Sequence, residues 1–80
     1  MPRRFFTEAL GWYGVAAIIS AYALLSFSIV RADSLLFQIL NLTGAIGIVT
    51  DSLPDRNWQP IVLNLIWATI ALLALSRILF

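Results

Sequence analysis

Side chains that commonly carry out catalysis are scarce in this sequence. Histidine and cysteine are absent, which excludes thiol catalysis, disulfides and metal sites built on imidazole or thiolate. The four carboxylates, Glu8, Asp33, Asp51 and Asp55, fall in three polar segments with no base, nucleophile or metal-ligand set beside them. We therefore expect no enzymatic activity, no cofactor and no metal site.

The basic residues do not suggest a nucleic-acid ligand. All five are arginines, they stand in four separate places, and the formal net charge is +1. Nucleic-acid binding requires a basic patch or stripe, which this distribution does not provide. We therefore expect no nucleic-acid partner.

The remaining candidates are polar or indole side chains inside long apolar stretches. In lipid each polar group requires a hydrogen-bond partner or a water-lined cavity. The candidates for intramembrane polar contacts or a pocket are Gln38, Asn41, Asn64, Trp67 and Thr69. Two interpretations stay open: these side chains tie helices together, or they line a cavity that contacts a solute. A direct Asn41–Asn64 bond is not expected, because helix rise places the two amides at different depths.

The elements that position these residues follow from the distribution of charge. The chain has 80 residues, of which 61% are hydrophobic, and a mean hydropathy of +0.94. Its charges form four clusters, separated by 22, 17 and 20 uncharged residues. Each gap is close to the ~20 apolar residues that a helix needs to cross a bilayer. We predict an all-α membrane protein, a single domain over 1–80 with three transmembrane helices in a small bundle, spanning about 9–30, 35–50 and 61–79. The first span is too long for the ~7–15-residue apolar region of a cleaved signal peptide, so we expect it to be retained.

The connections between the spans contain helix-capping signals. A four-residue connection after the first span makes spans one and two antiparallel neighbours. Asp33 or Ser34 is expected to cap the second helix with a side-chain oxygen. Pro60 suits the first turn of the third helix, and Asn57 or Gln59 can cap that helix.

Arginines and aromatic residues predict how the spans sit in the bilayer. Three arginines fall on the side of the amino terminus and two on the other: Arg3, Arg4 and Arg56 against Arg31 and Arg77. This excess favours a cytoplasmic amino terminus, in what we expect to be a bacterial cytoplasmic membrane. An aromatic belt is expected from Trp12, Tyr13 and Trp58 at that face, while Arg77 anchors the opposite interface.

Small residues recur at helical spacing in all three spans. They form helix-packing surfaces, and they comprise Gly14, Ala17 and Ala21, then Gly44 and Gly47, then Ala68 and Ala71. Three helices make a thin bundle. We therefore expect the protein to act by association in the lipid bilayer, either as a homo-oligomer (a dimer or higher) or as an accessory subunit of a larger membrane complex.

Two resemblances add to this interpretation. The blocks WYGVAAIISAYALLSF, QILNLTGAIG and PIVLNLIWATIALLALSR resemble a widespread family of short bacterial three-helix membrane proteins of unknown function, over about Gly11–Arg77. More loosely, the layout is similar to the SemiSWEET half-transporters, through Gly14-Val-Ala-Ala17 and the Pro-Ile-x-Leu before Asn64. That resemblance implies a dimer enclosing a sugar pathway lined by Asn64 and Trp67. The Pro-Gln pair of that family is absent, and Ser20-Ala-Tyr-Ala-Leu stands in its place.

Overall fold

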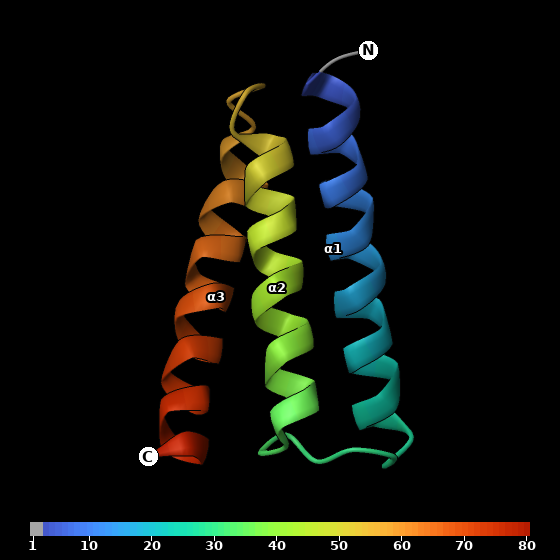
Figure 1. Cartoon of the computed structure of the whole chain (residues 1–80), viewed down its shortest axis with the longest axis vertical. Helices are drawn as coiled ribbons and strands as arrows, with labels where there is room; N and C mark the ends of the chain where they lie inside the picture. Colours follow the sequence, from blue (N-terminus) through green and yellow to red (C-terminus); the bar gives the residue numbers. More distant parts are fainter. Residues whose placement is uncertain (1–2) are drawn as a thin grey trace.

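Three antiparallel helices make up the structure, a computed structural model that describes residues 3–80, with side chains from Phe5 onward (Figure 1). Helix α1 comprises Arg3–Ser26, α2 Leu35–Ser52 and α3 Trp58–Leu79, and the described residues include no strand. All three helices are long and apolar enough to cross a membrane, over Phe5–Ser26, Leu35–Ser52 and Trp58–Leu79. This confirms the predicted fold class.

The surface of the molecule is as apolar as its interior. Large side chains such as Trp12, Phe27 and Leu73 are exposed, whereas the buried hydrophobic residues are small apart from Ile61. A soluble protein rarely exposes so much continuous apolar surface, but the hydrocarbon core of a bilayer accommodates it. The longest dimension is 38 Å, which spans a hydrocarbon core of about 30 Å and reaches its boundaries.

The first helix starts and ends earlier than the expected span of 9–30. It begins at Arg3 and ends at Ser26, so residues 27–30 lie in a turn. The end is a Schellman motif, in which the Ile29 amide donates to the Leu24 carbonyl at 2.8 Å and Ser28 to Leu25 at 3.0 Å. Ser28 takes the left-handed position with φ 61°. Glycine usually occupies this position. Because a serine stands here instead, the end of α1 was not predictable from the sequence.

The same motif closes the second helix. Beyond Ser52 the Asn57 amide donates to the Ser52 carbonyl at 3.2 Å, and Arg56 adopts φ 52°. At the other end of α2 the Oγ of Ser34 accepts from the Phe37 amide at 3.2 Å, so Ser34 is the cap. Pro60 lies in the first turn of α3, as predicted, but Asn57 precedes that helix without a side-chain capping bond.

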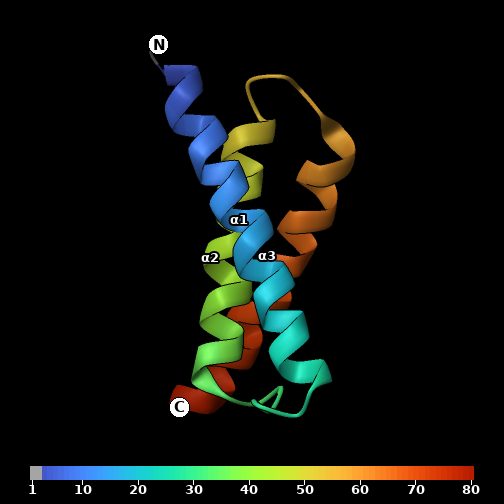
Figure 2. The same ribbon diagram turned by 90° about the vertical axis from the view of Figure 1, so that its right-hand side faces the viewer.

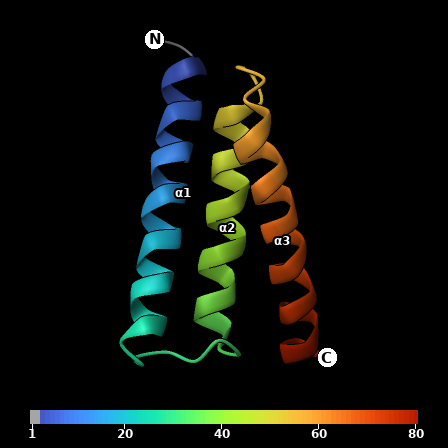
Figure 3. The ribbon, with the colours of Figure 1, turned by 180° about the vertical axis from the view of Figure 1, so that it is seen from behind.

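The helices form an open arrangement with α2 in the middle. Helices α1 and α3 both pack on α2, and in the described part of the chain they do not pack on each other. Figures 1 and 3 show the three helices side by side, with α2 between its neighbours. Seen from the side of α1, that helix crosses in front of the other two (Figure 2). One side of α2 therefore lies between its contact with α1 and its contact with α3.

Candidate functional site

The α1–α2 contact is built on glycines. A methyl group added at Gly14 would collide with the carbonyl oxygen of Gly44, and one added at Gly47 with the carbonyl oxygen of Leu10. At Gly44 it would lie 3.0 Å from the carbonyl oxygen of Gly14. The glycine C–H bonds therefore point at carbonyl oxygens of the opposite helix, a geometry that supports weak Cα–H···O bonds. The two backbones approach too closely for any larger residue.

One hydroxyl pair joins the same two helices. The Tyr13 hydroxyl lies 2.6 Å from Thr43 Oγ1, which in turn donates to the Ile39 carbonyl at 2.8 Å. Because Thr43 has only one hydroxyl hydrogen, Tyr13 must be the donor between the helices. Tyr13, predicted as a belt residue, therefore also forms a helix–helix contact. This contact was not predicted, because the sequence does not determine how the two helices are rotated relative to each other.

The α2–α3 contact centres on Asn41 and Trp67. The indole Nε1–H of Trp67 donates to Asn41 Oδ1 at 3.1 Å. The Asn41 amide nitrogen donates to the Phe37 carbonyl of its own helix at 2.9 Å, so both ends of the amide are engaged. Asn41 is only 6% exposed, and Ala45 and Ala71 are buried nearby on the same two helices. Asn41 therefore bonds to α3 through an indole, not through Asn64.

The other expected polar contacts stay local. Asn64 is buried, and its amide donates to the Pro60 carbonyl of its own helix at 2.9 Å. Thr69 is exposed and donates to the Leu65 carbonyl at 2.8 Å. Each bond gives the polar side chain a hydrogen-bond partner within its own helix. The structure does not bring Asn64 or Thr69 together with Asn41.

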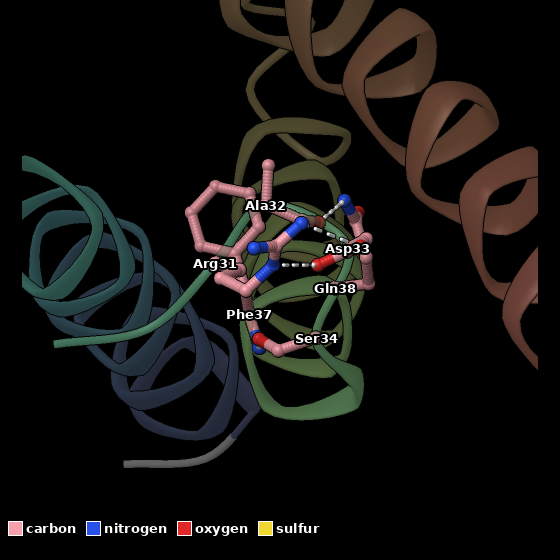
Figure 4. A network of polar contacts seen from close by, with 6 residues as sticks. All are labelled: Arg31, Ala32, Asp33, Ser34, Phe37 and Gln38. Atoms are coloured by element: carbon pink, nitrogen blue, oxygen red, sulfur yellow. Dashed lines mark hydrogen bonds and ion pairs between the residues drawn. The ribbon is translucent and has the colours of Figure 1, made fainter. Parts of the chain in front are cut away.

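Gln38 and its neighbours fix the connection between α1 and α2 (Figure 4). The buried Gln38 amide donates to the Ala32 carbonyl at 2.8 Å. The exposed Arg31 guanidinium donates to both oxygens of Asp33, at 3.0 and 3.4 Å. This hydrogen bond and the attraction between the charges lower the pKa of Asp33 and raise the pKa of Arg31. The connection is thus held by one buried side-chain bond to its backbone and carries one exposed ion pair.

Two cavities open on one face of α2. The first holds about 120 Å³ between α2 and α3, and it is lined by Phe37, Gln38, Asn41, Trp67, Ile70 and Ala71. The second holds about 250 Å³ between α1 and α2, and it is lined by Glu8, Gly11, Trp12, Val15, Ile48 and Asp51. The α2 residues Phe37, Asn41, Ile48 and Asp51 lie four, seven and three positions apart, which places them on one side of the helix. We call these four residues the open face.

The remaining predicted residues lie as follows. Ala17 and Ala21 of α1 are buried, while Ala68 of α3 is half-buried. The belt residues Trp12 and Trp58 are exposed at the same end of the molecule, near the starts of α1 and α3. Arg77 is exposed in the last turn of α3. The side chains of the topology residues Arg3 and Arg4 lie outside the described residues. Glu8 and Asp51 line the same cavity, which helical spacing did not predict because the two residues belong to different helices.

Comparison with known proteins is informative only at the level of the family. A family model matches residues 7–80, nearly the whole chain, and that family is uncharacterised. No curated protein and no solved structure gives a significant match. The resemblance to SemiSWEETs is not supported, whereas the resemblance to a family of unknown function agrees with the match. The chain therefore belongs to an uncharacterised family and is a small membrane protein with three apolar helices.

Proposed function

We propose that this protein acts by association within the bilayer, and that a further transmembrane helix packs on the open face. Homo-oligomers with two-fold symmetry are the commonest assemblies, so a second copy of the chain is the first choice of partner. An accessory role in a larger complex uses the same face. The protein is expected in the bacterial cytoplasmic membrane with a cytoplasmic amino terminus.

The position of polar groups along the open face carries the proposal. Asn41 and Asp51 belong to this face, and the two cavities beside it also contain Trp67 and Glu8. Polar and ionisable groups within a membrane protein usually face other helices or a cavity rather than lipid chains. Phe37, Ile48 and Asp51 are only half-buried, and in the described part of the chain α1 and α3 do not pack on each other, so one chain does not cover this face completely. A helix from another subunit would cover it.

The alternative is a half-transporter that passes a small polar solute such as a sugar. The hydrogen bonds described above favour association instead, because the amides of Asn41 and Asn64 bond within one chain. The cavity beside Asn41 holds about 120 Å³. Small-molecule sites usually hold about 300–1,000 Å³. A solute pathway would therefore have to form between copies, around a shared axis.

Disulfide crosslinking tests the proposed face. The sequence contains no cysteine, so single-cysteine variants need no prior engineering. In a parallel two-fold dimer identical residues meet at one depth, so Val15→Cys and Phe37→Cys should form dimers on oxidation in membranes. Ile39→Cys and Ile46→Cys are matched controls, because about 100° of rotation per residue places them on the opposite side of α2. These controls should remain monomeric.

Native mass spectrometry in nanodiscs gives an independent readout. A dimer mass together with crosslinks at the open face alone supports the homo-oligomer. A stable complex with another protein, with no crosslinks between copies, supports the accessory role. A strictly monomeric mass with no co-purifying protein refutes association. Equal crosslinking from Ile46→Cys refutes the choice of face. Loss of solute uptake in Asn64→Ala liposomes, with the assembly intact, would favour transport.

A further inference from the structure

We infer that the end of the molecule formed by the α1–α2 connection and the last turns of α3 binds the phosphate group of a phospholipid, with Arg77 as its principal ligand. This inference does not rest on the proposed association, because Arg77 is not part of the open face. It concerns a hollow on the surface, one cationic side chain inside it, and the apolar walls around that cation.

The hollow lies between the connection and α3. It holds about 580 Å³ and is lined by Ala32, Asp33, Ala74, Arg77 and Ile78. Arg77 also lines an adjacent hollow of about 490 Å³ with Leu73, Ala74 and Ser76. Both walls are mainly apolar, and Arg77 is the cation that the two hollows share. A phospholipid has the matching form, with an anionic group joined to hydrocarbon chains.

The charge of Arg77 is available to a ligand. Among the described residues Arg77 forms no ion pair and no side-chain hydrogen bond. The carboxylate that lines the same hollow, Asp33, is already bound through both oxygens to Arg31. Arg31 and Asp33 therefore neutralise each other, and the guanidinium of Arg77 is left without an anion. Guanidinium groups bind phosphate oxygens through two parallel N–H donors, which suits this site.

The wall opposite α3 is held in place. Gln38 is 9% exposed, and its amide donates to the Ala32 carbonyl at 2.8 Å. Figure 4 shows this bond beside the Arg31–Asp33 pair, which is exposed to solvent. The buried amide of Gln38 thus holds the short segment that faces Arg77. The hollow is formed before a ligand arrives, so binding does not require the connection to become ordered.

The position in the bilayer identifies the source of the phosphate. Arg77 lies in the last turn of an apolar helix that is long enough to cross the membrane. At such an end an arginine reaches the headgroup layer while its stem stays in hydrocarbon. A lipid phosphate is present at this depth, and the apolar residues Leu73, Ala74 and Ile78 contact the chains below it. A free phosphate ion would leave these apolar walls without a partner.

Lipid retention in native mass spectrometry tests the inference. Purified protein in detergent is titrated with phosphatidylglycerol, and the bound fraction is measured. Near a membrane surface one arginine contributes about fivefold in affinity for an anionic lipid, so Arg77→Gln should weaken binding by about that factor. Arg77→Lys keeps the charge but loses the two parallel donors, so its affinity should lie between those of the wild type and Arg77→Gln. If Arg77→Gln binds phosphatidylglycerol as tightly as the wild type does, the proposed site is refuted. An unchanged circular dichroism spectrum shows that the variant is folded.

The ion pair offers a matched control at the same end of the molecule. The double variant Arg31→Gln/Asp33→Asn removes one positive and one negative charge and keeps the Gln38–Ala32 bond, so lipid affinity should fall much less than in Arg77→Gln. Asp33→Asn alone frees the Arg31 guanidinium and should strengthen binding. An equal loss of affinity in the double variant would show that the surface of the connection, not the charge of Arg77, holds the lipid.

A second arm separates the two sources of phosphate. Inorganic phosphate is added to delipidated protein while the side-chain Nε resonance of Arg77 is followed by NMR. The inference expects a large shift with phosphatidylglycerol and little change with inorganic phosphate. If inorganic phosphate alone saturates the shift and displaces the lipid, the ligand is a free anion, and the assignment to a phospholipid is wrong.

Discussion

A methyl group on either of two glycines should separate α1 from α2. In Gly14→Ala and Gly47→Ala the new methyl meets a backbone carbonyl of the opposite helix, which cannot rotate away as a side chain can. Overpacking of this kind costs about 1–3 kcal/mol, and alanine regains about 0.5–1 kcal/mol over glycine within a helix. The net expected loss lies in the range of about 0–2.5 kcal/mol in the free energy of unfolding for each variant.

A neighbouring glycine provides the control for this prediction. The atoms nearest to a methyl at Gly11 belong to the side chain of Asp51 and include its Cβ at 2.8 Å, but no backbone carbonyl is among them. Gly11→Ala should therefore be destabilised less than Gly14→Ala, because part of the Asp51 side chain can rotate away whereas a backbone carbonyl cannot, and because alanine has the higher helix propensity. Unfolding is measured in mixed micelles against the mole fraction of a denaturing detergent. If Gly14→Ala is as stable as Gly11→Ala, the close backbone contact does not hold the two helices together.

Three further predictions concern helix ends, the interhelical amide and the ion pair. Ser28→Gly should stabilise the protein by about 1 kcal/mol in the same assay, because glycine adopts the left-handed conformation without strain. Trp67→Phe removes the donor to Asn41 and should destabilise by about 0.6–1.7 kcal/mol, and a double-mutant cycle with Asn41→Leu should show coupling of that size. The pKa of Asp33 should lie below its ordinary 3.8, so the stabilisation from the Arg31 pair exists above that pH and is lost as pH falls through the lowered value. NMR titration of the Asp33 carboxyl measures this pKa.

The controls for these predictions use the same positions. Ser28→Ala should give none of the glycine gain, since alanine has the same strained Cβ. Additive effects in the cycle, with no coupling between Trp67 and Asn41, would mean that their hydrogen bond does not form in the membrane. Arg31→Gln should return the Asp33 midpoint toward 3.8, and an unchanged midpoint would assign the shift to another cause.

The number of helices was predictable because charge is excluded from hydrocarbon. Uncharged gaps of 22, 17 and 20 residues leave little choice of spans. The end of α1 was not predictable in the same way, since Ser28 and the apolar residues around it carry no terminating signal. A glycine at that position would have given one. Local signals were effective only where a side chain takes part, as in the Ser34 cap.

Candidate residues were found more easily than their partners. Helical spacing identified the glycines and Asn41 as residues that face other helices, because spacing fixes positions around a single axis. It does not fix the rotation of one helix against the next. For this reason the spacing did not pair Asn41 with the indole of Trp67, which supplies its bond to α3, while Asn64 and Thr69 bond within α3.

Because α2 packs against both other helices, the molecule consists of two helical hairpins, α1–α2 and α2–α3, that have α2 in common. The angle between α1 and α3 is set only through their separate contacts with α2, since the two outer helices do not touch in the described part of the chain. A change in that angle therefore breaks no direct contact between α1 and α3, and α2 serves as the hinge. On the α1 side the hinge is tight, because glycine backbones meet there. On the α3 side a cavity lies beside the Asn41–Trp67 bond, so movement should occur chiefly between α2 and α3.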